Sequence, residues 1–189
     1  MQKEKGRKQN AKDERLSSLA AATFCLMTLT FCLFPARGRA EVIDRVLAVV
    51  SGSLITLSDV NAAHDLGLVT PRPSGDPIRE VLSQLIDREL QLAEVDRYAP
   101  PEPSAADVDR EVQAVQARFP SPAAFEDVLA RSGIDLAHLR ETMRDDLRIR
   151  GYLAQRFSVS EDRRQQVVDE WVAGLRRRAD IIDLYLAGR

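Results

Sequence analysis

The residues of this chain that could carry chemistry are few and scattered. The two histidines, His64 and His138, each fall on a predicted helix, and neither has a second histidine at metal-ligand spacing. A solvated or structural role fits both better than metal binding. Ser51 and Ser53 flank Gly52, but no nucleophile elbow or phosphate-binding loop surrounds them. The sequence therefore predicts a non-enzymatic protein with no catalytic residue, no metal site, no cofactor and no use of ATP.

Two charged residues stand out because of their positions on predicted helices. Glu89 falls within the apolar stripe of a helix over residues 77–98, and Arg150 within that of a helix over residues 136–157. Buried charges are normally paired. The pattern predicts that Glu89 and Arg150 form a structural ion pair, or that each finds another partner where the helices meet. The alternative is that each long side chain reaches solvent past the edge of its stripe.

The elements that must position these residues begin with a hairpin over residues 42–57. Its first strand is apolar on both faces, and the serine-glycine-serine stretch at residues 51–53 is typical of a tight turn. Ser58 is expected to cap the helix that follows, because Asp59 then lies in the first turn, where a negative charge is favourable.

Further helices are expected up to residue 178, separated by proline-rich breaks at 71–77, 100–103 and 120–122. Capping residues and apolar periodicity mark where these helices begin and end. The first expected helix covers residues 58–67. Three further helices cover residues 77–98, with Asp76 as the cap and Pro77 in the first turn, 105–119, with Ser104 as the cap, and 136–157, with Asp135 as the cap. A short helix that ends at Gly133 precedes the last of these, and a final helix runs from Ser160 to residue 178.

Residues 180–186 are rich in residues that favour strands. They are expected to pair with the first strand of the hairpin, because an isolated hairpin is only marginally stable in water. The predicted fold is therefore mostly α: a multi-helix domain with a small antiparallel sheet formed by the N-terminal hairpin and a C-terminal strand.

Residues 1–40 have the layout of a secretory signal peptide. A basic segment precedes the uncharged residues 16–34, and Gly38 and Ala40 supply the small residues of a cleavage site. The alternative is an uncleaved anchor in the inner membrane, since residues 16–34 are just long enough to span a bilayer. The sequence therefore predicts a periplasmic protein whose mature part, residues 41–189, lacks cysteine because Cys25 and Cys32 are removed.

The composition of residues 41–189 argues against binding to nucleic acids. This part of the chain has 19 arginines and no lysine, against 26 aspartates and glutamates. Contact with phosphates needs a basic face.

Several segments, in order, resemble the N-terminal domain of SurA-type periplasmic chaperones. The opening hairpin, residues 85–90 (LIDREL) and the terminal segment over residues 171–185 carry the resemblance, which covers most of residues 41–189. That family usually inserts one or two parvulin-type prolyl isomerase domains before the terminal segment. Here only residues 158–160 separate the two long helices, so isomerase activity is not expected.

The resemblance implies an ATP-independent envelope chaperone, or holdase, that binds unfolded outer-membrane or exported proteins. Two alternatives stay open: a module for one fixed envelope partner, and a subunit that assists a separate prolyl isomerase. A holdase needs exposed apolar surface. Leu90, Val95, Ile149 and Leu153 lie off the main stripes, where they either line a binding groove or pack against neighbouring helices.

Overall fold

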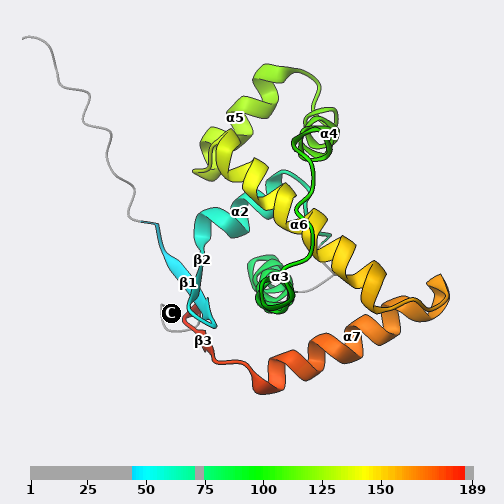
Figure 1. Cartoon of the computed structure of the whole chain (residues 1–189). Coiled ribbons are helices and arrows are strands. Elements are labelled where there is room, and N and C mark those ends of the chain that lie inside the picture. The colour runs from blue at the N-terminus through cyan, green and yellow to red at the C-terminus, as the bar shows by residue number, and fades with distance from the viewer. Residues whose placement is uncertain (1–43, 71–74, 186–189) are drawn as a thin grey trace, which may run out of the picture. The chain divides into compact units, whose positions relative to one another are not determined.

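The computed structural model describes residues 44–70 and 75–185, with only the backbone described at residues 161 and 162. This part of the chain is mostly helical with one small antiparallel sheet, which confirms the predicted fold class (Figure 1). The predicted signal peptide and the alternative membrane anchor lie outside the described residues. The elements are β1 (Val46–Val50), β2 (Ser53–Thr56), α2 (Leu57–Asp65), α3 (Pro77–Tyr98), α4 (Ala105–Gln116), α5 (Pro122–Ser132), α6 (Leu136–Arg156), α7 (Glu161–Arg178) and β3 (Ile181–Asp183).

The sheet joins the first and last described elements. β1 lies in the centre, with β2 and β3 antiparallel on either side. Ser51 and Gly52 both have positive φ, the backbone of a two-residue type I′ turn, and Val50 pairs with Ser53 across it. On the other side Val50 pairs with Ile181. The predicted return of the C-terminal strand is thereby confirmed, although that strand is shorter than residues 180–186.

Helix α3 is the central helix of the described structure. It packs against α2, α6, α7 and both strands of the hairpin, and Figure 1 shows it end-on among them. Asp76 caps its start by accepting a hydrogen bond from the Arg79 N–H at 3.0 Å, and Pro77 occupies the first turn. Ala99, at φ 44°, ends it. These bounds match the predicted helix over residues 77–98.

The apolar core is divided into three clusters. The first lies between the sheet and α3, with α7 along its side, and the second lies among α2, α4, α5 and the first half of α6. A third, smaller cluster joins the ends of α3 and α6 to α7. Buried members are Leu47, Val50, Val60 and Leu82 in the first cluster, Leu66, Val112, Phe125 and Leu139 in the second, and Val95, Ile149 and Tyr152 in the third.

Helix α6 changes its buried face as it passes from the second cluster to the third. Leu139 and Met143 are buried against the second cluster, as predicted, whereas Ile149 and Tyr152 are buried against the third. An apolar stripe that is assumed to run straight along α6 therefore assigns the wrong buried face to the second half of the helix. Arg150, expected on the buried stripe, is 57% exposed.

The start of α2 differs from the prediction. Thr56, not Ser58, is the N-cap: its hydroxyl accepts from the Asp59 N–H, and its own N–H donates to the Asp59 carboxylate at 2.8 Å. This is a capping box, so the cap lies two residues earlier than expected and the helix begins at Leu57 rather than at residue 58. Ser58 lies against Gly133 instead. Helix α4 also ends earlier than predicted, at Gln116, because its last residues form a tighter turn in which Phe119 N–H donates to Gln116 C=O at 3.1 Å.

Replacing Gly133 with alanine should destabilise the fold by about 1–2 kcal/mol, because an L-residue is strained in the left-handed region. Gly133 has φ 78°, and an added Cβ would lie 2.9 Å from the Ser58 hydroxyl. Gly151→Ala is the matched control, since nothing lies near its added Cβ within helix α6. Removing a glycine from a helix interior should raise stability by about 0.5–1 kcal/mol. Urea unfolding measures both, and equal effects would contradict the assigned helix boundary.

Candidate functional site

A cleft of about 240 Å³ opens between the hairpin, α2, α3 and the first half of α6. One wall is apolar and comes from β2, α2, the residues after α2, α3 and the turn before α6. We call it the α3–α6 cleft. Its apolar lining consists of Leu54, Ile55, Ala62, Ala63, Leu68, Val69, Leu85, Leu92 and Ile134. Leu54 is 60% exposed, so the apolar wall continues to the protein surface.

The rest of the lining, the polar wall, is mostly acidic. It is formed by one residue of α2, two neighbouring residues of α3 and five residues of α6. This lining consists of Asp59, Arg88, Glu89, His138, Glu141, Thr142, Asp145 and Asp146. Five of these side chains are carboxylates, and only Arg88 is a permanent cation.

Arg88 is the centre of this polar wall. Its Nε donates to Asp146 at 2.7 Å, one terminal nitrogen donates to Glu89 at 2.9 Å, and the other donates to the Thr142 carbonyl at 3.1 Å. Asp145 lies 4.0 Å from the guanidinium. The side chain is only 20% exposed. Burial alone would lower the pKa of Arg88, but the surrounding carboxylates raise it above its usual range, so the charge is kept.

The pKa of Glu89 is raised above its usual range. Partial burial is the largest cause, and the charges of Asp145 and Asp59 add to it, while Arg88 opposes the shift without reversing it. A carboxylate that is partly buried beside other carboxylates holds its charge less readily than a solvated one.

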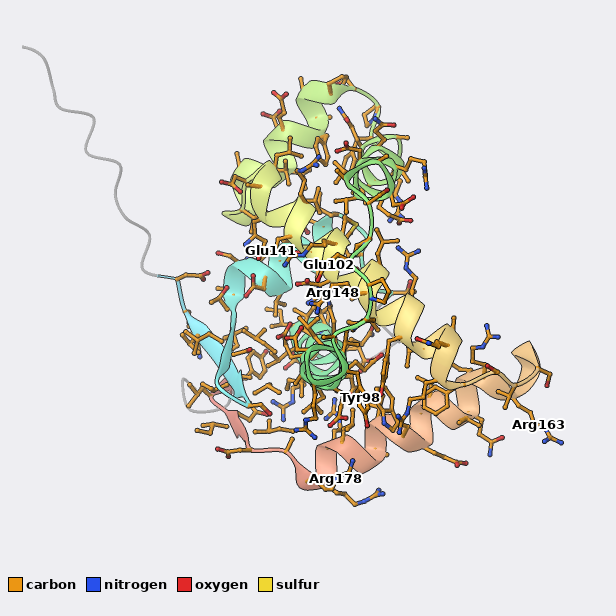
Figure 2. All side chains as sticks on the ribbon, viewed as in Figure 1. Tyr98, Glu102, Glu141, Arg148, Arg163 and Arg178 are labelled. Atoms are coloured by element: carbon orange, nitrogen blue, oxygen red, sulfur yellow. The ribbon has the colours of Figure 1, made fainter. Side chains whose placement is uncertain are left out.

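The polar wall continues along the seam between α3 and α6. Arg148, only 11% exposed, lies 2.8 Å from Asp96, 3.1 Å from Glu102 and 3.7 Å from Asp145 (Figure 2). It therefore links α3, the segment before α4 and α6. Ion pairs of this kind hold the two helices that form the cleft at a fixed distance from each other.

His138 closes one end of the cleft by pairing with Asp59. The His138 Nε2 lies 3.3 Å from Asp59 Oδ1 and so connects α6 to the capping box of α2. The hydrogen bond with Asp59 raises the pKa of His138. Burial would raise the pKa of Asp59, but hydrogen bonds from His138 and Thr56 lower it below its usual range. This histidine has a structural partner, and the other one, His64, is exposed beside Asp65.

Glu89 and Arg150 do not pair with each other as the sequence pattern suggested. Glu89 lies in the cleft and pairs with Arg88, while Arg150 pairs with Glu111 of α4 at 3.0 Å. The structure corresponds to the alternative in which each finds another partner. The direct pair is excluded because α6 turns the Arg150 side chain toward α4 and solvent.

The residues proposed to line a groove lie inside the core instead. Leu90, Val95 and Ile149 are buried, and Leu153 is partly buried against the third cluster. They pack against neighbouring helices, as the alternative prediction had it. The sequence analysis missed the actual apolar wall because its members, such as Leu54 and Leu85, come from different elements.

Two charged residues of the cleft are not marked by the apolar stripes of the sequence. Arg88 directly precedes Glu89, and Asp145 of α6 is only 9% exposed. A signal was present: Asp145 precedes Ile149 and Tyr152 by four and seven residues, which is the spacing of one helix face.

The polar side chains of the cleft are five carboxylates, one guanidinium, one imidazole and one hydroxyl. Thr142 is the only hydroxyl-bearing residue that lines it, and its Oγ1 donates to the His138 carbonyl at 3.1 Å. Within residues 44–70 and 75–185, no group of three histidine, cysteine or acidic side chains is placed to hold a metal ion. In the same ranges, no helix combines the length and apolarity needed to cross a bilayer.

Comparison with known proteins gives no further guidance. No protein-family model matches the chain, and no curated protein matches it significantly.

Replacing Arg88 with methionine should destabilise the protein by about 3 kcal/mol, because it leaves Glu89 and Asp146 without their cation. Arg97→Met on the same helix is the control. Arg97 is 73% exposed and pairs only with Glu94, so its loss should change stability by less than about 0.5 kcal/mol. Equal urea midpoints for the two variants would show that the Arg88 network does not hold α3 to α6.

The His138 imidazole should titrate with a midpoint above 6.5, and Asp59→Asn should lower that midpoint. Since folding raises the pKa of His138, its stabilisation is complete below pH 6.5 and is lost as pH rises through the raised value. Since folding lowers the pKa of Asp59, the stabilisation that its carboxylate contributes is present above pH 3.8 and is lost as pH falls through the lowered value. The pair contributes less than about 1 kcal/mol because His138 is half exposed. Proton NMR of the imidazole measures the midpoint, and an unchanged value in Asp59→Asn would contradict the pairing.

Proposed function

We propose that this protein is a non-enzymatic, ATP-independent envelope chaperone that holds unfolded outer-membrane or exported polypeptides. The observation that carries the proposal is the α3–α6 cleft, whose apolar lining reaches the surface at Leu54 and is combined with polar side chains. Unfolded polypeptides offer apolar side chains together with unpaired backbone groups. A surface cleft lined by apolar and polar side chains suits both the apolar side chains and the backbone groups of such a polypeptide.

The arrangement of elements supports the same proposal. The N-terminal hairpin, the long helix with its LIDREL stretch and the returning C-terminal strand follow the order that led to the resemblance with SurA-type chaperones. The client class and the periplasmic location both rest on that resemblance and on the predicted signal peptide in residues 1–40.

The size of the cleft favours a second candidate function. At about 240 Å³, the cleft is smaller than pockets for drug-sized ligands, and the Arg88 and Arg148 ion pairs fix its walls. Promiscuous binders usually have adaptable surfaces. A rigid, small cleft therefore also suits one fixed envelope partner, for which the protein would be an assembly module or would assist a separate prolyl isomerase.

The protein should suppress light scattering when unfolded outer-membrane proteins are diluted from urea with a stoichiometric amount of it. Leu54→Ser should weaken the suppression at least twofold, because it removes the exposed part of the apolar wall. Leu136→Ser is the control: Leu136 is 47% exposed and lies outside the cleft lining.

Several unrelated β-barrel clients should respond alike if the protein is a general holdase. Absence of suppression by well-folded protein would overturn the chaperone proposal in favour of the single-partner module. Equal losses in the Leu54→Ser and Leu136→Ser variants would place client binding outside the cleft.

A further inference from the structure

We infer that the α3–α6 cleft selects polypeptide segments in which an arginine or lysine stands next to an apolar residue. The inference rests on the proposed function, since it concerns what the same cleft accepts from a bound polypeptide. The acidic lining adds a preference for cationic side chains, which apolar contacts alone do not provide.

The first argument is the charge of the polar wall. Arg88 is already engaged by Asp146, Glu89 and the Thr142 carbonyl, so it offers little to a ligand. Glu141 is 65% exposed and has only a 3.4 Å contact with Arg144, itself 44% exposed. A visiting cation therefore meets the accessible carboxylate of Glu141 at the rim and, farther in, that of Glu89, which shares Arg88 with Asp146.

The second argument is the burial of Glu89. Its side chain is 19% exposed and faces the charges of Asp145 and Asp59 as well as that of Arg88. Burial is the main cause of the raised pKa of Glu89, and the charges of Asp145 and Asp59 add to it. A second cation would relieve the repulsion, and it would do so in a site where partial burial strengthens the attraction. An anionic side chain would increase the same repulsion.

The third argument is the apolar wall, which makes the site more than a group of carboxylates. Leu85 and Leu92 of α3 line the cleft three residues before Arg88 and three residues after Glu89, on the same face of the helix. Arginine and lysine carry long aliphatic stems that pack on such surfaces while the charged end stays among polar groups. The wall therefore accommodates the stem or an apolar neighbour.

The position of β2 favours a polypeptide over a free amine. β2 is an edge strand of the sheet, and its Leu54 and Ile55 both line the cleft. An extended segment can lie along an edge strand and place a side chain into an adjoining cleft. The volume of about 240 Å³ suits one or two side chains and excludes a folded element.

The test uses three labelled peptides that differ at one position within an apolar sequence: arginine, glutamine or glutamate. Fluorescence anisotropy with the full chain should show the arginine peptide binding at least about tenfold more tightly than the glutamine peptide, and the glutamate peptide binding most weakly. The preference should shrink at 1 M salt, where the Debye length falls to about 3 Å.

Two isosteric variants tie the preference to the cleft. Glu89→Gln and Glu141→Gln each remove a negative charge while keeping an acceptor, and both should reduce the ratio between the arginine and glutamine peptides. Glu126→Gln is the matched control, because Glu126 is exposed on α5 outside the cleft lining and should leave the ratio unchanged. Thermal unfolding checks that all three variants remain folded.

The outcomes separate this inference from the proposed function. Equal binding of the three peptides overturns the charge preference and leaves the chaperone proposal standing. Suppression of aggregation without binding of any of the peptides also overturns it, since clients then use another surface. Free arginine amide that competes as well as the arginine peptide does overturns the assignment to polypeptides. Absence of both peptide binding and suppression removes the proposed function itself.

Discussion

The buried guanidinium of Arg88 is the interaction on which the arrangement of the helices depends. A charge in this position is stable only when its donors are satisfied, and Arg88 finds its partners on α6 at Asp146 and the Thr142 carbonyl. The preceding residue, Asp87, points about 100° away around α3 and accepts from Arg176 of α7 at 2.5 Å. Two neighbouring residues of one helix thus fix two other helices against it, and the apolar clusters form within that frame.

The need of Arg88 and its carboxylates for polar partners also explains why the α3–α6 cleft remains open. Helices α3 and α6 meet through polar side chains beside Arg88, and charged groups need partners or water rather than close apolar packing. The apolar residues of the hairpin, α2 and α3 that face this seam, among them Leu54 and Leu85, consequently keep one side uncovered. A cleft that combines apolar and acidic side chains is thus a consequence of how the charges are placed.

Much of the fold follows from local signals in the sequence. Asp76, Ser104, Ser121 and Asp135 each accept a hydrogen bond from a backbone N–H in the first turn of the helix that they precede. The resulting starts of α3, α4 and α6 agree with the predictions. Thr56 is the exception, because it competes with Ser58 and succeeds through the reciprocal bond with Asp59. Such capping choices depend on single hydrogen bonds, so boundaries shift by a residue or two while the elements themselves are kept.

The sequence by itself determined the class of the fold, the order of its elements and the return of the last strand, because these depend on periodicity, prolines, caps and strand-forming residues over short distances. The tertiary structure alone decided which charges are buried. Arg150 looked buried and is exposed, whereas Arg88 and Asp145 are largely buried. The reason is that a helix such as α6 packs against different neighbours along its length, so its buried face turns. The cleft likewise draws its walls from elements far apart in the chain, and no local pattern records which of them will meet.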